Sequence, residues 1–194
     1  MIVDFAGGAP FEARKRSHLR VRENILEDVN PHPEVPALLR ASKDALGVRA
    51  KSQDCVWEDV VAAARSWIGT PYRHQASLKG VGCDCLGLVR GVWREVLGEE
   101  PEAVPAYSPD WAEASGAEAL ADAAFRHLNL VEGLRFQAGD VVLFRWKPHL
   151  PAKHAGIATG DVSMVHAQDG IAVSEVALSR WWLRRVAGVY RFPG

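Results

Sequence analysis

The sequence predicts an α+β fold in which helices come first and an antiparallel β-sheet follows. Apolar residues recur at helical spacing before Gly139, whereas short runs rich in β-branched and aromatic residues follow it. Helices that precede strands in this way are typical of α+β domains. The 194 residues are 48% hydrophobic and 24% charged, which lies within the ordinary range for globular proteins.

Three regions show helical patterns. The first extends from Asp54 to Ile68 and ends at Gly69. The second follows Asp84 and ends at Gly98, and its Gly87 and Gly91, four residues apart, would let another backbone come close. The third is expected from about Trp111 to Leu128, because Asp110 and Glu113 have the capping-box offset. The stretch between Glu95 and Phe125 is acidic and predicts a solvated flap rather than a metal site.

The second half of the chain predicts strands. Each run is short, apolar and bounded by turn residues, as in antiparallel sheets. The expected strands are 141–146, 155–158, 162–167, 171–176 and 188–192.

The first fifty residues differ in texture from the rest. Prolines at 31, 33 and 36 interrupt any long element, and one short helix is expected over 36–46. We therefore divide the chain into an N-terminal appendage, 1–53, and a folded domain, 54–194. The basic cluster Arg14–Arg22 leaves two interpretations of the appendage open, a partner-docking arm or a flexible solvated one.

Charge and hydropathy exclude several classes of protein. Lys and Arg total 23 and Asp and Glu total 24, so the net charge of −1 disfavours a nucleic-acid partner. No stretch approaches the roughly 20 apolar residues of a membrane span, and the N-terminus has no secretory pattern. We expect synthesis in the cytoplasm without a signal peptide. The odd cysteine count, Cys55, Cys83 and Cys85, indicates thiols rather than a disulfide framework.

Cys85 is a candidate nucleophile because of its position. If Asp84 is the N-cap, Cys85 is the first helical residue, where the helix dipole favours a thiolate and backbone N–H groups are unpaired. The alternative is that Cys85 is a small buried hydrophobic residue of this helix.

His154 and His166 are the candidate bases. Gly160 lies midway between them, so an odd-length loop of three or five residues would set the two histidines directly opposite each other on one sheet face. One imidazole could then accept the thiol proton while the second orients it. A two-residue turn would instead send them to opposite faces.

Two other kinds of site remain as alternatives. Cys83, Cys85, His154 and His166 offer soft zinc ligands, although their spacing departs from the usual zinc patterns. Trp181 and Trp182, followed by Arg184 and Arg185, are the best surface candidates for stacking on sugars or peptides.

Five ordered motifs resemble one known family. They are Gly69-Thr70-Pro71-Tyr72, Gly82-Cys83-Asp84-Cys85-Leu86-Gly87-Leu88-Val89, Ala138-Gly139-Asp140-Val141-Val142-Leu143-Phe144, His154-Ala155-Gly156-Ile157 and Met164-Val165-His166-Ala167. Together they resemble the NlpC-type cell-wall cysteine peptidases, in particular the branch encoded by tailed phages and phage-like gene transfer agents. The resemblance covers about residues 55–192. It implies a papain-like fold, with the nucleophile-bearing helix packed on an antiparallel sheet.

The resemblance also implies roles for single residues. Cys85 corresponds to the nucleophile, His154 to the general base and His166 to the residue that orients it, without a metal or cofactor. Tyr72 corresponds to a tyrosine near the nucleophile that assists with the oxyanion or substrate, and Asp84 to a substrate-binding residue. Many members have Ser after the cysteine, whereas this chain has Leu86, which favours intact or cross-linked wall peptides over amine-terminal fragments.

The implied function is hydrolysis of peptidoglycan stem peptides between the γ-carboxyl of D-glutamate and a diamino acid. The resemblance further implies a tail component that is assembled inside the cell, docks on tail proteins through residues 1–53 and acts in the periplasm or cell wall. The alternative is a non-enzymatic tail protein that keeps the fold for assembly and wall binding. Retention of Cys85, His154 and His166 favours the enzyme.

Overall fold

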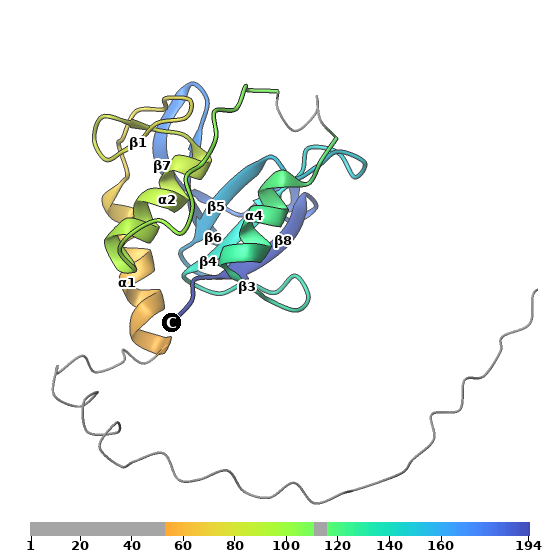
Figure 1. Ribbon diagram of the computed structural model, residues 1–194. Coiled ribbons are helices and arrows are strands. Elements are labelled where there is room, and N and C mark those ends of the chain that lie inside the picture. The colour runs from red at the N-terminus through yellow and green to blue at the C-terminus, as the bar shows by residue number, and fades with distance from the viewer. Residues whose placement is uncertain (1–52, 111–115) are drawn as a thin grey trace, which may run out of the picture. The chain divides into compact units, whose positions relative to one another are not determined.

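The computed structural model describes residues 53–110 and 116–194, so the appendage 1–53, apart from its last residue, and the helix expected over 36–46 lie outside the described residues. Figure 1 shows the arrangement of the elements. In chain order they are α1 (Gln53–Ser66), β1 (Ser77–Leu78), β2 (Gly82–Cys83), α2 (Cys85–Val96), α4 (Ala119–His127), β3 (Asn129–Leu130), β4 (Asp140–Phe144), β5 (His154–Ala158), β6 (Ser163–Gln168), β7 (Ile171–Ala177), α5 (Arg180–Leu183) and β8 (Val186–Arg191). None of the helices in the described part is long and apolar enough to cross a membrane.

A six-stranded antiparallel sheet forms the centre of the fold, with the strand order β3-β8-β4-β5-β6-β7. The α+β class is therefore confirmed. The expected strands begin and end within two residues of the observed ones. Short apolar runs bounded by turn residues marked these strands, and β4 and β5 are buried along their whole length.

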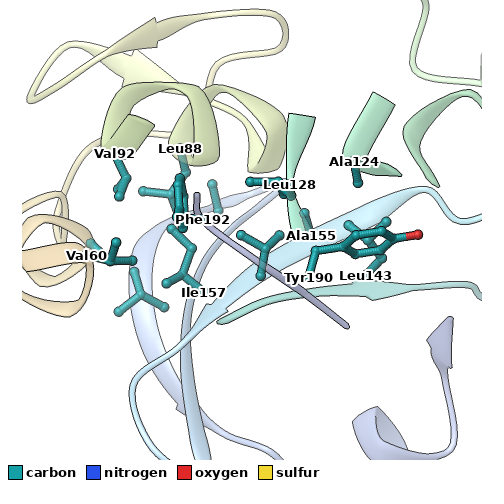
Figure 2. Packing of buried hydrophobic residues seen from close by; sticks show 14 of the residues in the cluster. Val60, Leu88, Val92, Ala124, Leu128, Leu143, Ala155, Ile157, Tyr190 and Phe192 are labelled. Atoms are coloured by element: carbon teal, nitrogen blue, oxygen red, sulfur yellow. The ribbon is translucent and has the colours of Figure 1, made fainter. Parts of the chain in front are cut away.

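One face of the sheet is covered by α1, α2 and α4. Val60 of α1 and Leu88 and Val92 of α2 are 1% exposed or less. Figure 2 shows Leu88 and Val92 directed toward Ile157 of β5 and Phe192 beyond β8. Each fully buried aliphatic side chain of this kind contributes about 1.5–3 kcal/mol.

The opposite sheet face carries a smaller apolar cluster. It contains Phe144 of β4 and Ala158 and Met164 of the β5–β6 pair, with Trp182 packed against it. Because neighbouring residues of a strand point to opposite faces, β5 contributes Ala155 and Ile157 to the helix-covered face and its other residues to this one.

Two glycines of α2 permit the close approach that the sequence predicts. A Cβ at Gly87 would lie 1.9 Å from the carbonyl oxygen of Ala76, and one at Gly91 would lie 2.0 Å from the indole of Trp67. Real Cβ atoms do not approach so closely. These two positions let the loop before β1 and the end of α1 pack directly on α2.

The helix expected over 111–128 is shorter than predicted. Residues 116–118 are not helical, and α4 begins at Ala119. Gly116 has a φ of +63°, outside the right-handed helical region, so the helix cannot run through it. Glu113 of the expected capping box lies outside the described residues.

The acidic stretch after α2 is mostly exposed to solvent, as the sequence predicts, but it is also attached to the two helices that flank it. Residues 98–107, which we call the strap, lead from α2 toward α4 and form ion pairs with both helices. Glu100 forms ion pairs with Arg90 and Arg94 of α2, and Glu102 pairs with Arg126 of α4 at 2.8 Å. The sequence did not predict these ion pairs, because the basic partners lie outside the acidic run.

Candidate active site

Cys85 is the first residue of α2, and Asp84 caps the helix as predicted. Oδ1 of Asp84 accepts a hydrogen bond from the backbone N–H of Gly87 at 2.8 Å. The cap fixes the start of the helix, and with it the backbone that carries the thiol.

Asp84 is also a junction between three segments. Its Oδ2 accepts a 2.7 Å hydrogen bond from the backbone N–H of Gln75 and a 2.5 Å hydrogen bond from the Tyr107 hydroxyl of the strap. Asp84 is 3% exposed. Both oxygens are thus engaged within the protein, and the substrate-binding role predicted for Asp84 stays a prediction.

The sulfur of Cys85 lies at the start of β5. It accepts hydrogen bonds from the backbone N–H groups of Ala155, Leu86 and Cys85 itself, which favour the thiolate. Burial and the neighbouring Asp84 carboxylate oppose them and raise the pKa of Cys85 to about 11. The lowered pKa expected from the helix terminus is therefore wrong for the free protein, because desolvation of the thiolate outweighs the N–H groups.

His154 and His166 are in direct contact. Nε2 of His154 and Nδ1 of His166 are 3.0 Å apart, and both side chains are buried. The prediction that they share a face is confirmed, but they are not directly opposite. The last β5–β6 pair is Ala158 with Met164, so the connection 159–163 is centred on Asp161. His166 therefore lies across from Gly156, which has no side chain, and not across from His154.

The two imidazoles are held neutral. Burial, together with the second imidazole, lowers the pKa of His154 to about 3, and burial lowers the pKa of His166 to about 4. Their contact requires one ring to donate and the other to accept. If His154 donates from Nε2, its Nδ1 retains a lone pair and can accept a proton.

Aromatic rings surround the His154 side chain. Trp146 and Trp182 stack on it with ring centroids 5.6 and 5.5 Å away, and Phe144 lies at 6.0 Å. These rings exclude water from the imidazole and limit its rotation. Trp146 had no sequence signal as a site residue, because it belongs to the site only through the β4–β5 pairing.

Tyr72 lies close to the nucleophile. Residues 71–73 run beside Cys83, with hydrogen bonds of 3.1 Å from Cys83 N to Pro71 O and 3.0 Å from Arg73 N to Cys83 O. Burial, followed by the charges of Asp84 and Cys85, raises the pKa of Tyr72 to about 12. Its hydroxyl therefore remains protonated at neutral pH and can donate a hydrogen bond.

The alternative zinc site is not formed. Cys83 is fully buried in the apolar core, where burial raises its pKa to about 12, so it does not reach the surface that Cys85 faces. Among residues 53–110 and 116–194, no group of three or more His, Cys, Asp or Glu side chains could hold a metal ion.

A cavity of about 210 Å³ opens beside Cys85. Its walls include Leu86, Val104 and Tyr107, together with Lys153 and the ion pair of Arg126 with Glu102. Tyr107 was missed by the sequence interpretation, since it lies 23 residues from Asp84 in the strap. Leu86 makes the wall next to the nucleophile apolar.

A thiol at a helix N-terminus, next to a strand that carries a coupled imidazole pair, defines the class of cysteine hydrolases with a papain-like arrangement. The chain belongs to the NlpC/P60 family, whose model matches residues 69–191.

Known proteins support the assignment. The chain is 30% identical over 150 residues to a γ-DL-glutamyl hydrolase of Bacillus subtilis strain 168, which covers 76% of this chain and 32% of that protein. An NlpC/P60 protein of Bacillus cereus superposes with a TM-score of 0.52 at 20% identity, covering 70% of this chain and 40% of the other. NlpC2 of Trichomonas vaginalis gives 0.51 at 18% identity, covering 71% and 46%. The chain thus spans about a third of the curated relative and under half of these two structures.

Proposed function

We propose that this protein is a cysteine endopeptidase of peptidoglycan stem peptides that hydrolyses the amide between the γ-carboxyl of D-glutamate and a diamino acid. The observation that carries the proposal is the arrangement at the start of β5. There His154 contacts His166, and the backbone N–H of the following residue, Ala155, donates a hydrogen bond to the Cys85 sulfur. The similarity to a γ-DL-glutamyl hydrolase supports the choice of bond.

The reaction begins from a neutral thiol and a neutral imidazole. Nδ1 of His154 accepts the Cys85 proton as the sulfur attacks the carbonyl carbon, and the imidazolium is stabilised by His166. The Tyr72 hydroxyl and the N–H groups at the start of α2 stabilise the oxyanion. The C–N bond then breaks, His154 gives its proton to the leaving amine, and water hydrolyses the thioester.

The cavity beside Cys85 suits the acyl side of the substrate. Its volume of about 210 Å³ can hold the D-glutamyl residue, and Lys153 on its wall supplies a positive charge for the free α-carboxylate, whereas Arg126 is already paired with Glu102. The apolar wall at Leu86 supports the preference for intact or cross-linked wall peptides.

The test is digestion of purified peptidoglycan, with released peptides identified by mass spectrometry. Cys85→Ala and His154→Ala should each lower the rate by about 10⁴-fold or more, because residues that act as a unit do not contribute additively. Cys83→Ala, with folding checked by circular dichroism, is the matched thiol control. Equal product from wild type and Cys85→Ala would overturn the proposal, and absence of product from the folded wild type would favour the non-enzymatic wall-binding alternative.

We further propose that the enzyme is a component of a phage-like tail, made in the cytoplasm and delivered to the periplasm or cell wall. The five motifs that resemble the tail-associated branch support this role. Residues 1–53 would dock on a tail protein. Mass spectrometry of purified particles should find the protein at fixed stoichiometry, and deletion of 1–53 should remove it from them; particles that retain the deleted form would contradict the docking role.

A further inference from the structure

Two indole rings lie against the side chain of His154, one from the segment after β4 and one from α5. Their planes are inclined to the imidazole by 25° for Trp146 and 26° for Trp182, at the centroid distances of 5.6 and 5.5 Å. Trp182 also lies edge-on to His166, with centroids 5.3 Å apart, so one ring contacts both imidazoles. The sequence favoured Trp182 as a surface ring for stacking on sugars or peptides, whereas the structure packs it on the candidate base. Both indoles thus lie nearly parallel to the His154 ring, in an offset stack.

The proposed reaction places a positive charge on this imidazole. The Cys85 thiol, with its pKa raised to about 11, must give its proton to His154, with its pKa lowered to about 3. Burial disfavours both charged products. The transfer therefore needs groups that stabilise the imidazolium without taking the proton from it.

No carboxylate in the described part of the chain supplies this stabilisation. The ion pairs between histidine and carboxylate there involve His74 and His127, not the two imidazoles of the site. His166 contacts His154 at 3.0 Å, but burial lowers the pKa of His166 to about 4, so it supplies a hydrogen bond and no negative charge. The imidazolium must be stabilised by uncharged neighbours.

The indole faces meet this requirement. A cation within about 6 Å of an indole centroid is attracted to the negative face of the ring, and the attraction is larger where water is excluded. The rings of Trp146 and Trp182 both satisfy this distance. Charged side chains beside the cluster are cations and would not help: Lys153 precedes the imidazole in the chain, and Arg185 lies 3.8 Å over the Trp181 ring. Arg185 thus occupies the neighbouring indole and leaves the two stacked rings to the imidazole.

We propose that Trp146 and Trp182 are positioning residues that stabilise the imidazolium of His154 through cation–π contact, in the place of a carboxylate. The inference rests on the proposed function and adds to it the groups that make the proton transfer possible. The proton moves from the Cys85 sulfur to Nδ1 of His154 and then to the leaving amine, so the positive charge lies beside the indoles only between these two steps. The indoles form no bond and exchange no proton. They act on kcat and not on binding of the peptide.

The experiment weakens the negative face of each ring without changing its shape. Monofluoro- or tetrafluorotryptophan is incorporated at position 146 or 182, and cleavage of a stem tripeptide is measured. The kcat should fall stepwise with fluorination, to about one-tenth of wild type for the tetrafluoro ring at either position, with KM constant within about twofold. Tetrafluorotryptophan at position 93, where the indole packs beside Phe192, is the matched control and should leave kcat unchanged.

A kcat that does not depend on fluorination at positions 146 and 182, in a protein that cleaves the peptide, would overturn the inference while the proposed function stands. An equal loss at position 93 would show a general effect of fluorine and would overturn it as well.

An equilibrium measurement tests the contact even if no peptide is cleaved and the proposed function fails. Cys85→Asp sets a carboxylate beside His154 and should raise its pKa, which is followed by NMR titration. In the same variant with tetrafluorotryptophan at position 146, that pKa should be lower by about one pH unit, which corresponds to tenfold. An equal pKa in the two proteins would mean that the indoles only shield the imidazole, contrary to the inference.

Discussion

The strap uses charge in the opposite way from the groove, as we call the recess of about 600 Å³ whose lining includes Arg145, Trp146, Lys147, Trp181, Arg184 and Arg185. Glu100, Glu102 and Tyr107 of the strap are bonded to side chains of α2, α4 and the α2 cap. In the groove, Lys147 and Arg184 have no carboxylate partner within the described residues. The comparison teaches that charges paired within the fold position the nucleophile, whereas unpaired charges beside a site are available to a ligand. The three predictions below test it.

Removal of the Asp84 carboxylate should have the largest effect on stability. Asp84→Ala leaves the N–H groups of Gly87 and Gln75 and the Tyr107 hydroxyl without their acceptor. Loss of the cap and of buried hydrogen bonds should lower the free energy of unfolding by about 3 kcal/mol, measured by urea denaturation. Asp84→Asn keeps an acceptor for Gly87 and should lose about half as much. A loss below about 0.5 kcal/mol in Asp84→Ala would mean that the strap is held by other contacts.

Acid should destabilise the protein through its two buried histidines, His154 and His166. The folded pKa values of about 3 for His154 and about 4 for His166 lie below the unfolded value of 6.5, so the unfolded state binds more protons at intermediate pH. Stability should therefore be complete above about pH 6.5 and fall as the pH decreases toward 4, by up to about 1.4 kcal/mol per pH unit for each imidazole. The acid limb of kcat/KM should also lie well below pH 6.5.

Urea unfolding at pH 7, 6 and 5 measures the slope. His166→Gln should reduce it, because one of the two buried imidazoles is removed. His149→Gln changes an exposed histidine of the β4–β5 connection and should leave the slope unchanged. A wild-type stability independent of pH over this range would show that the imidazoles are not buried in solution.

The smallest effects should distinguish the strap from the groove directly. Glu100→Gln breaks partly buried ion pairs with Arg90 and Arg94 and should lower the free energy of unfolding by about 1 kcal/mol. Arg184→Ala in the groove should change it by less than about 0.5 kcal/mol. Glu99→Gln is the matched strap control. Glu99 accepts a hydrogen bond from Trp93 through its backbone carbonyl, so the substitution leaves that bond in place. A larger loss in Arg184→Ala than in Glu100→Gln would contradict the comparison.

Local patterns in the sequence predicted most of the fold and half of the site. Short-range rules account for the N-cap at Asp84, the two close-contact glycines and the five main strands: capping, sterics, and apolar runs bounded by turn residues. The shared face of His154 and His166 follows from strand parity. All of these features depend on residues within a few positions of each other.

The features that sequence reasoning missed depend on contacts between distant segments. The turn after β5 is centred one residue later than Gly160, because register is decided by packing of both strands. Burial reversed the expected direction of the Cys85 pKa shift, and burial cannot be determined from the residues next to a cysteine. Tyr107 and Trp146 joined the site only after the strap and the sheet brought them there.

The attachment of the strap at Glu100, Glu102 and Tyr107 has a consequence for sequence change in descendants of this protein. Insertions or deletions between these residues would move the Tyr107 hydroxyl away from Asp84 and with it the start of α2. The length of the chain between Glu100 and Tyr107 is therefore constrained by both of its attachments. A surface connection that looks replaceable thus sets where the thiol-bearing helix begins.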